Sequence, residues 1–110
     1  YFNPLSRNTW AKHIGTIASI NPSGVFNLGS RNGLSKADFA IMFAEELRLP
    51  TANIKTVKLD EVNFIKTPRP KDMRMNVEKI ENFLGVDMPL LIDEIKLVSK
   101  EYKNWTIVLK

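Results

Sequence analysis

The pattern of apolar positions predicts four helices along the chain. Apolar side chains recur at three- and four-residue steps, the spacing that places them on one face of a helix. Candidate capping residues precede each stretch, and Pro50 and Gly85 follow the second and third. The predicted helices cover residues 7–20, 35–49, 77–84 and 87–102, with candidate caps at Ser6 or Asn8, Ser35, Asn76 and Asp87.

Two further segments predict strands. Residues 25–28 form a short apolar run closed by Gly29, which favours a buried strand, and residues 54–59 alternate apolar side chains with lysines. The predicted helix between them gives the length that a right-handed parallel crossover needs. The expected fold is therefore α/β, or more broadly α+β, with about four helices and a short parallel strand pair. Residues 103–110 are expected to form a strand or an extended tail.

Length and composition restrict the possible classes. With 110 residues and 12.6 kDa, the chain predicts a single domain over residues 1–110. The absence of cysteine excludes disulfides and thiolate metal sites, and the single histidine, His13, is expected on a helix surface rather than in a metal site. Without a long apolar run or a signal-peptide layout, we expect a cytoplasmic protein that does not enter membranes.

No catalytic motif is present in the sequence. The segment GVFNLGSRNG contains three glycines, but it matches neither a phosphate loop nor a dinucleotide fingerprint. Glu45 and Glu46 are adjacent on a predicted helix and cannot face each other as a carboxylate pair. We therefore expect no catalytic residue in this chain.

A basic loop is the strongest candidate for binding. Lys66, Arg69, Lys71 and Arg74 lie within nine residues. Pro68 and Pro70 hold Arg69 in an extended backbone, and a guanidinium matches the oxygens of a phosphate better than an ammonium does. Arg69 is the first predicted substrate-binding residue, with Lys71 and Arg74 as secondary ones. A loop of merely solvated charges is the alternative.

Two segments taken together resemble the carboxy-terminal, substrate-binding part of the extended short-chain dehydrogenases/reductases, most closely the dTDP-4-dehydrorhamnose reductase family. The first is the strand-like motif from Gly24 to Gly29, followed by Ser35. The second is an Arg-Pro-x-Asp-like turn followed by a lysine and a Leu-Gly pair, matched by Arg69, Pro70, Asp72, Lys79, Leu84 and Gly85. The likeness covers most of residues 9–100, and it is the ordered combination that makes it specific.

The resemblance implies a lobe that closes over a nucleotide-diphosphate sugar while a Rossmann domain holds NAD(P)H. It places Arg69 on the diphosphate; Lys71 stands where many relatives carry glycine. The family's catalytic Tyr-x-x-x-Lys has no counterpart, because Leu5 follows Tyr1 and Thr106 follows Tyr102 at that spacing. We therefore expect no cofactor on this chain. It would be the carboxy-terminal portion of a longer reductase of deoxysugar and surface-polysaccharide synthesis, with its Rossmann domain missing, or a relic that binds without catalysing.

Two other functions remain as alternatives. A non-catalytic interaction or regulatory module derived from the same fold fits the same segments. The net charge of +4 also permits a nucleic-acid binder. That last reading ranks lowest, because the sequence contains no helix-turn-helix spacing, zinc pattern or interleaved aromatic residues, so no nucleic-acid partner is expected.

Overall fold

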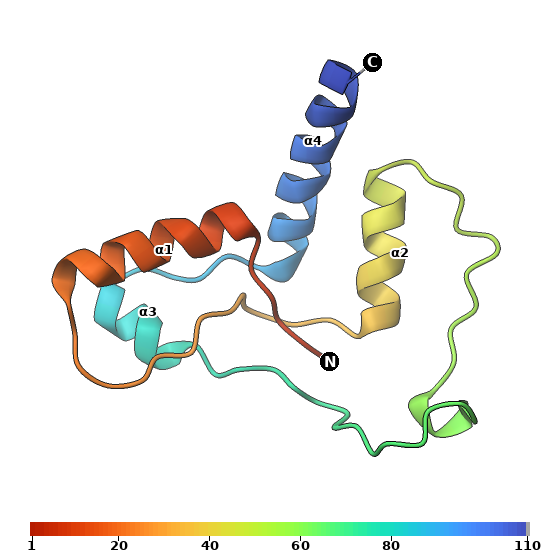
Figure 1. Cartoon of the computed structure of the whole chain (residues 1–110), viewed down its shortest axis with the longest axis horizontal. Coiled ribbons are helices and arrows are strands. Elements are labelled where there is room, and N and C mark those ends of the chain that lie inside the picture. The colour runs from red at the N-terminus through yellow and green to blue at the C-terminus, as the bar shows by residue number, and fades with distance from the viewer. Residues whose placement is uncertain (110) are drawn as a thin grey trace.

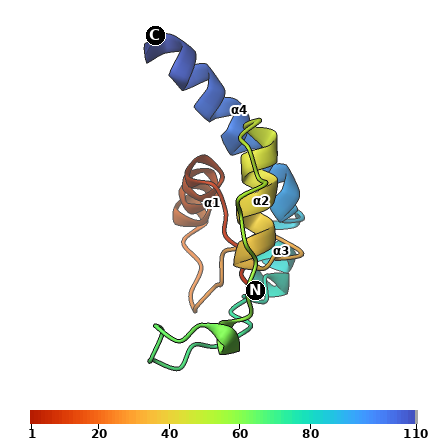
Figure 2. The same cartoon turned by 90° about the vertical axis from the view of Figure 1, so that its right-hand side faces the viewer.

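The computed structural model describes residues 1–109, with side chains described up to residue 104, and it is helical. In chain order the helices are α1 (Arg7–Ile20), α2 (Lys36–Glu46), α3 (Glu78–Leu84) and α4 (Leu91–Leu109), with a 3-10 turn, η1 (Leu59–Glu61), between α2 and α3. The described part of the chain is flat, measuring 47 × 42 × 20 Å. Figure 1 shows its broad face, and Figure 2 shows the thin edge.

Two of the predicted caps set the starts of their helices. The Oγ atoms of Ser6 and Ser35 accept hydrogen bonds from backbone N–H groups three residues on, at 3.2 and 3.1 Å. For the first helix this selects Ser6 rather than Asn8. The cap position of α3 is Val77 rather than the predicted Asn76, whose Oδ1 accepts from the N–H of Glu78 at 2.9 Å. Gly85 ends α3 with φ +66°, a conformation that glycine adopts without steric cost. The four predicted helices are thus confirmed.

Helix α4 differs from its prediction at both ends. It begins at Leu91, and the carboxylate of Asp87 accepts from Arg31 instead of capping the helix. Its backbone continues to Leu109, so residues 103–109 are helical rather than extended, since neither glycine nor proline interrupts them; Lys110 lies outside the described residues. None of the helices within residues 1–109 is long and apolar enough to cross a membrane.

The predicted α/β fold class is wrong. The described chain is 47% helix and 4% strand and contains no sheet. Its β pairings are two isolated bridges, Phe2–Leu34 and Arg31–Leu90. Residues 25–28 and 54–58 have no regular secondary structure, and Leu59 begins η1. The two segments form no ladder, and they lie on opposite sides of the molecule in Figure 1, in orange and yellow-green.

The failure of the strand prediction has a physical cause. An apolar run favours extended backbone, but a strand also requires a neighbour for its N–H and C=O groups. Neither segment has that neighbour here, and the side chains of Val25 and Val57 are 81% and 63% exposed.

The core lies where α3 meets α1 and the segment of residues 25–28. Val77, Ile80 and Met88 form a buried cluster, against which Ile17, Phe26, Leu28 and Leu84 pack. Helix α2 packs against α4, and the rings of Phe2 and Phe39 lie 5.2 Å apart, which joins α2 to the amino-terminal segment. The core therefore joins segments from both halves of the sequence.

Candidate anion-binding site

Arg69 is exposed on the loop between η1 and α3, flanked by Pro68 and Pro70 as predicted. None of the side chains up to residue 104 gives it a hydrogen bond or an ion pair. Lys66, three residues earlier, is exposed and unpaired in the same part of the structure. The guanidinium of Arg69 is therefore accessible to a ligand from solution.

Lys71 has a partner. Its Nζ lies 2.7 Å from Asp60 Oδ2, and the two side chains are 72% and 69% exposed. The backbone carbonyl of Lys71 accepts from the amino group of Tyr1 at 2.6 Å. An exposed ion pair of this kind is weak and screened by salt, so it leaves Lys71 able to change partners.

Arg74 is bound more closely, by Asp72. Its Nε donates to Asp72 Oδ1 and Oδ2 at 2.9 and 3.1 Å, and its Nη2 donates to Oδ2 at 2.6 Å. Asp72 Oδ1 also accepts from the backbone N–H of Arg74 at 3.0 Å. The guanidinium first, and then this backbone bond, lower the pKa of Asp72 to about 2. The same pair raises the pKa of Arg74.

The stem of Arg74 lies against the backbone at Gly33. A Cβ at residue 33 would lie 2.9 Å from both Cγ and Cδ of Arg74 and 2.4 Å from the carbonyl oxygen of Phe2. The ring of Tyr1 lies under the guanidinium, with Cζ 5.4 Å from its centroid. Arg74 is therefore held in position from three sides.

The three predicted site residues are thus in different situations. Arg69 is free among the described residues, Lys71 pairs with Asp60, and Arg74 pairs with Asp72. No shared carboxylate joins them in residues 1–104. The role of the set in binding substrate stays a prediction.

A polar cleft of about 690 Å³ adjoins this loop. Its walls come from the amino-terminal segment, the turn before α2 and the start of α3. The lining residues are Asn3, Ser30, Arg31, Asn32, Gly33, Asp72, Arg74, Met75, Asn76, Val77, Glu78, Glu81 and Leu90. Arg74 and Asp72 therefore belong both to the basic loop and to the cleft.

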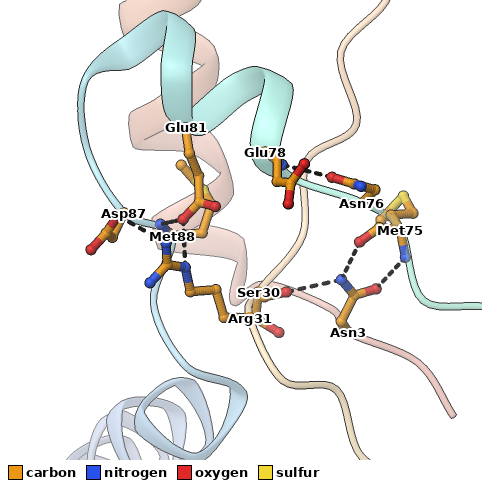
Figure 3. A network of polar contacts seen from close by, with 9 residues as sticks. All are labelled: Asn3, Ser30, Arg31, Met75, Asn76, Glu78, Glu81, Asp87 and Met88. Atoms are coloured by element: carbon orange, nitrogen blue, oxygen red, sulfur yellow. Dashed lines mark hydrogen bonds and ion pairs between the residues drawn. The ribbon is translucent and has the colours of Figure 1, made fainter.

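Asn3 holds the walls of the cleft together (Figure 3). Its buried amide donates to the carbonyls of Ser30 and Met75, both at 2.9 Å, and accepts from the N–H of Met75 at 2.9 Å. Ser30 is fully buried, and its Oγ has no hydrogen-bond partner in the described structure. The amino-terminal segment is thus fixed to two parts of the chain that are distant in sequence.

Arg31 forms a second charged group in the cleft. Its Nε donates to Glu81 Oε2 at 2.7 Å, and its Nη2 donates to Asp87 Oδ1 at 2.9 Å. Glu81 Oε2 also accepts from the N–H of Met88 at 2.7 Å. Burial raises the pKa of Glu81, but the bonds from Met88 and Arg31 together outweigh this and leave the pKa below its ordinary value. The bond to Glu81 is the main reason that the pKa of Arg31 is raised.

Sequence reasoning missed this group. Arg31 and Glu81 are 50 positions apart, and no local pattern links them. One signal was available, because Glu81 follows Val77 by four positions and so lies on the apolar face of α3. A carboxylate on a buried face requires a cation or several donors nearby.

No group of three or more His, Asp or Glu side chains among the described residues is placed to hold a metal ion. His13 lines a separate hollow on α1 with Lys12 and Thr16, and no bond to a serine or threonine hydroxyl is found for it within residues 1–104. The cations and polar lining can hold an anionic, hydroxyl-rich ligand.

Comparisons with models of protein families, with curated proteins and with solved structures gave no match for this chain.

Proposed function

We propose that this chain binds the diphosphate of a nucleotide-linked sugar, as the substrate-binding part of an NAD(P)H-dependent reductase of the dTDP-4-dehydrorhamnose reductase type. The observation that carries the proposal is the exposed guanidinium of Arg69, which lies between two prolines and has no partner among the described side chains. The resemblance noted above in residues 67–85 points to the same arginine.

The local backbone supports this role for Arg69. Pro68 and Pro70 fix their own φ angles and restrict the arginine between them, so less conformational entropy is lost when a ligand orders the loop. The guanidinium offers two parallel donors to a phosphate, which a lysine cannot do. Because no carboxylate of residues 1–104 pairs with Arg69, a diphosphate displaces no salt bridge with these residues when it binds there.

The neighbouring cleft supports the sugar part of the proposal. Asp72 lines the cleft three residues after Arg69, a separation of at most about 11 Å along the chain. Exposed amides and carboxylates, including those of Asn32, Asn76 and Glu78, line the same cleft and are suited to sugar hydroxyls. A ligand whose diphosphate binds Arg69 can therefore place its remainder there.

The nicotinamide cofactor does not fit the described residues. Dinucleotides bind where a glycine turn joins a parallel strand to a helix, and residues 1–109 contain no sheet. We therefore assign no step of hydride transfer to this chain. In our proposal the cofactor and the catalytic tyrosine and lysine belong to a Rossmann domain outside these residues.

The test is a chemical-shift titration with dTDP and a UDP-sugar, followed on the backbone amides and the arginine Nε–H signals. We expect saturable shifts centred on residues 66–76. Arg69→Gln should weaken binding about tenfold or more, since hydrogen bonds to charged groups are among the stronger ones.

Lys66→Gln is the matched control. It removes the same charge from another exposed, unpaired cation of the same loop. Equal losses in the two variants would indicate a diffuse attraction that falls steeply with salt, and would contradict a site at Arg69. The absence of shifts at millimolar ligand would also contradict the proposal.

A second candidate is the non-catalytic interaction module. The observation in its favour is the exposure of two large apolar side chains of the loop between α2 and α3, Val57 at 63% and Phe64 at 84%. If neither nucleotide binds, this candidate takes precedence.

A further inference from the structure

The guanidinium of Arg74 is held in position and already has a partner, the carboxylate of Asp72. Its stem rests on Gly33, and its guanidinium lines the cleft. Asp72 takes the edge formed by Nε and Nη2, at distances of 2.6 to 3.1 Å. Among the described residues no other side chain bonds to this guanidinium, and the carboxylate of Asp72 offsets its charge.

We propose that Asp72 is an internal competitor for Arg74 that lowers the affinity of the basic loop for the diphosphate. The inference rests on the proposed function and assigns Asp72 the role of a specificity-determining residue. An incoming anion must displace this carboxylate, or share Arg74 with it, to gain the full interaction. Asp72 and Arg74 are two positions apart, so the carboxylate competes at a high effective concentration.

Asp72 also has a structural role, which a suitable substitution can separate from its competition for Arg74. Its Oδ1 accepts from the backbone N–H of Arg74 and so holds a tight turn. An asparagine keeps an oxygen for that N–H, but it has no charge, and its NH₂ group cannot accept from the guanidinium. Asp72→Asn therefore preserves the turn, retains at most the bond from Nε, and removes both the bond from Nη2 and the competing charge.

The expected size of the effect is modest. The two side chains are 48% and 50% exposed, and ion pairs at such positions compete with water and salt. Release of Arg74 should therefore tighten anion binding by about three- to fivefold. Because the pKa of Asp72 is about 2, this competition operates at full strength throughout the neutral range.

The experiment measures the dissociation constant of pyrophosphate for the wild-type chain, Asp72→Asn and Glu61→Gln. Glu61 lies on η1 outside the cleft, is exposed and has no ion pair among the described residues. Its substitution changes the net charge by the same amount, keeps an oxygen for the N–H of Lys58 and leaves Arg74 and Asp72 as they are. We expect about three- to fivefold tighter binding for Asp72→Asn, about unchanged binding for Glu61→Gln, and a shift of the Arg74 Nε–H signal on titration.

Two further variants complete the test. Adding Arg74→Gln to Asp72→Asn should abolish the gain, because the released group is then absent. Asp72→Ser offers a neutral hydroxyl to the turn and should reproduce the gain if the asparagine variant folds poorly. Equal gains for Asp72→Asn and Glu61→Gln, or no gain for Asp72→Asn, would overturn the inference.

These outcomes differ from failure of the proposed function. If Arg69→Gln abolishes nucleotide binding while Asp72→Asn leaves pyrophosphate affinity unchanged, the site stands and the competitor role fails. If dTDP does not bind but Asp72→Asn tightens pyrophosphate, the competitor role stands without the nucleotide. If no variant binds either ligand, both are wrong.

Discussion

The packed region around α3 and the long loop between α2 and α3 use their apolar residues in opposite ways. Around α3, Ile80 and Met88 are 0% and 2% exposed, while in the loop Val57 and Phe64 are 63% and 84% exposed. Most of the loop is irregular, and its one helical element is η1. The comparison shows that burial, which stabilises this fold, is concentrated around α3 and the first turns of α4, whereas the predicted ligand contacts lie on a part of the chain that contributes little packing.

The two regions also differ in their polar contacts. Near α3, buried side chains bond to the backbone of distant segments, as Asn3 does to Ser30 and Met75. In the loop, the ion pairs of Lys71 and Arg74 are exposed and connect residues at most 11 positions apart. Disruption near α3 should therefore affect the whole fold, and disruption in the loop should affect binding.

The largest expected effect is at Ile80. Ile80→Ala removes a fully buried side chain from the core and should lower the free energy of unfolding by about 2–5 kcal/mol, enough to unfold a small domain. Ile80→Val should cost about 0.5–1.5 kcal/mol and keep the chain folded. Urea unfolding followed by circular dichroism measures both, and losses below these ranges would show that the cluster is less tightly packed than described.

A smaller loss is expected at Asn3. Asn3→Ala leaves the carbonyl of Ser30 without this donor and should cost about 1–3 kcal/mol. Asn27→Ala is the control, because the exposed Asn27 bonds to the carbonyl of Asn76 at 3.4 Å and should change stability by less than about 0.5 kcal/mol. Equal losses in the two variants would contradict the role given to Asn3.

One carboxylate from each region should titrate differently. The pKa of Glu81 lies below its ordinary 4.5 in the folded chain, so its stabilising effect is present above pH 4.5 and is lost as the pH falls through the folded value. For Asp72 the stabilising effect is lost as the pH falls from 3.8 to about 2. Because Asp72 is the more exposed, added salt should raise its pKa more than that of Glu81. NMR titration of the side-chain carboxyl carbons at two salt concentrations measures both, and a larger salt shift at Glu81 would reverse the comparison.

The smallest effect is expected at Phe64. Phe64→Ser should change the free energy of unfolding by less than about 0.5 kcal/mol, because the ring is mostly in solvent already. Urea unfolding followed by circular dichroism measures this change as well. A loss above about 1 kcal/mol would mean that the loop packs against the rest of the protein in solution.

Local signals in the sequence predicted the helices but not how they assemble. Ser6, Ser35 and Gly85 determine helix ends through their own hydrogen bonds and backbone preferences, so their neighbours in sequence suffice. The strand predictions failed because pairing depends on a distant partner, and neither residues 25–28 nor residues 54–59 found one.

The same limit applies to the candidate site. The residues of the basic loop could be named from the sequence, since proline and arginine act locally. The carboxylates that pair with these residues are harder to predict from the sequence. Asp72 is close enough to Arg74 to suggest a pair, but the contact of Lys71 with Asp60 and that of Arg31 with Glu81 follow from the path of the backbone.

The hydrogen bonds of the amino-terminal segment imply an order of folding. The N–H of Ser6 donates to Glu94, 88 positions away, and Asn8 donates to Glu101, 93 positions away, at 3.0 Å. On a ribosome, residues 3–8 are therefore synthesised long before the residues they bind. Contacts of such long range are slow to form, so α3 and its neighbours should fold first and residues 3–8 should dock last.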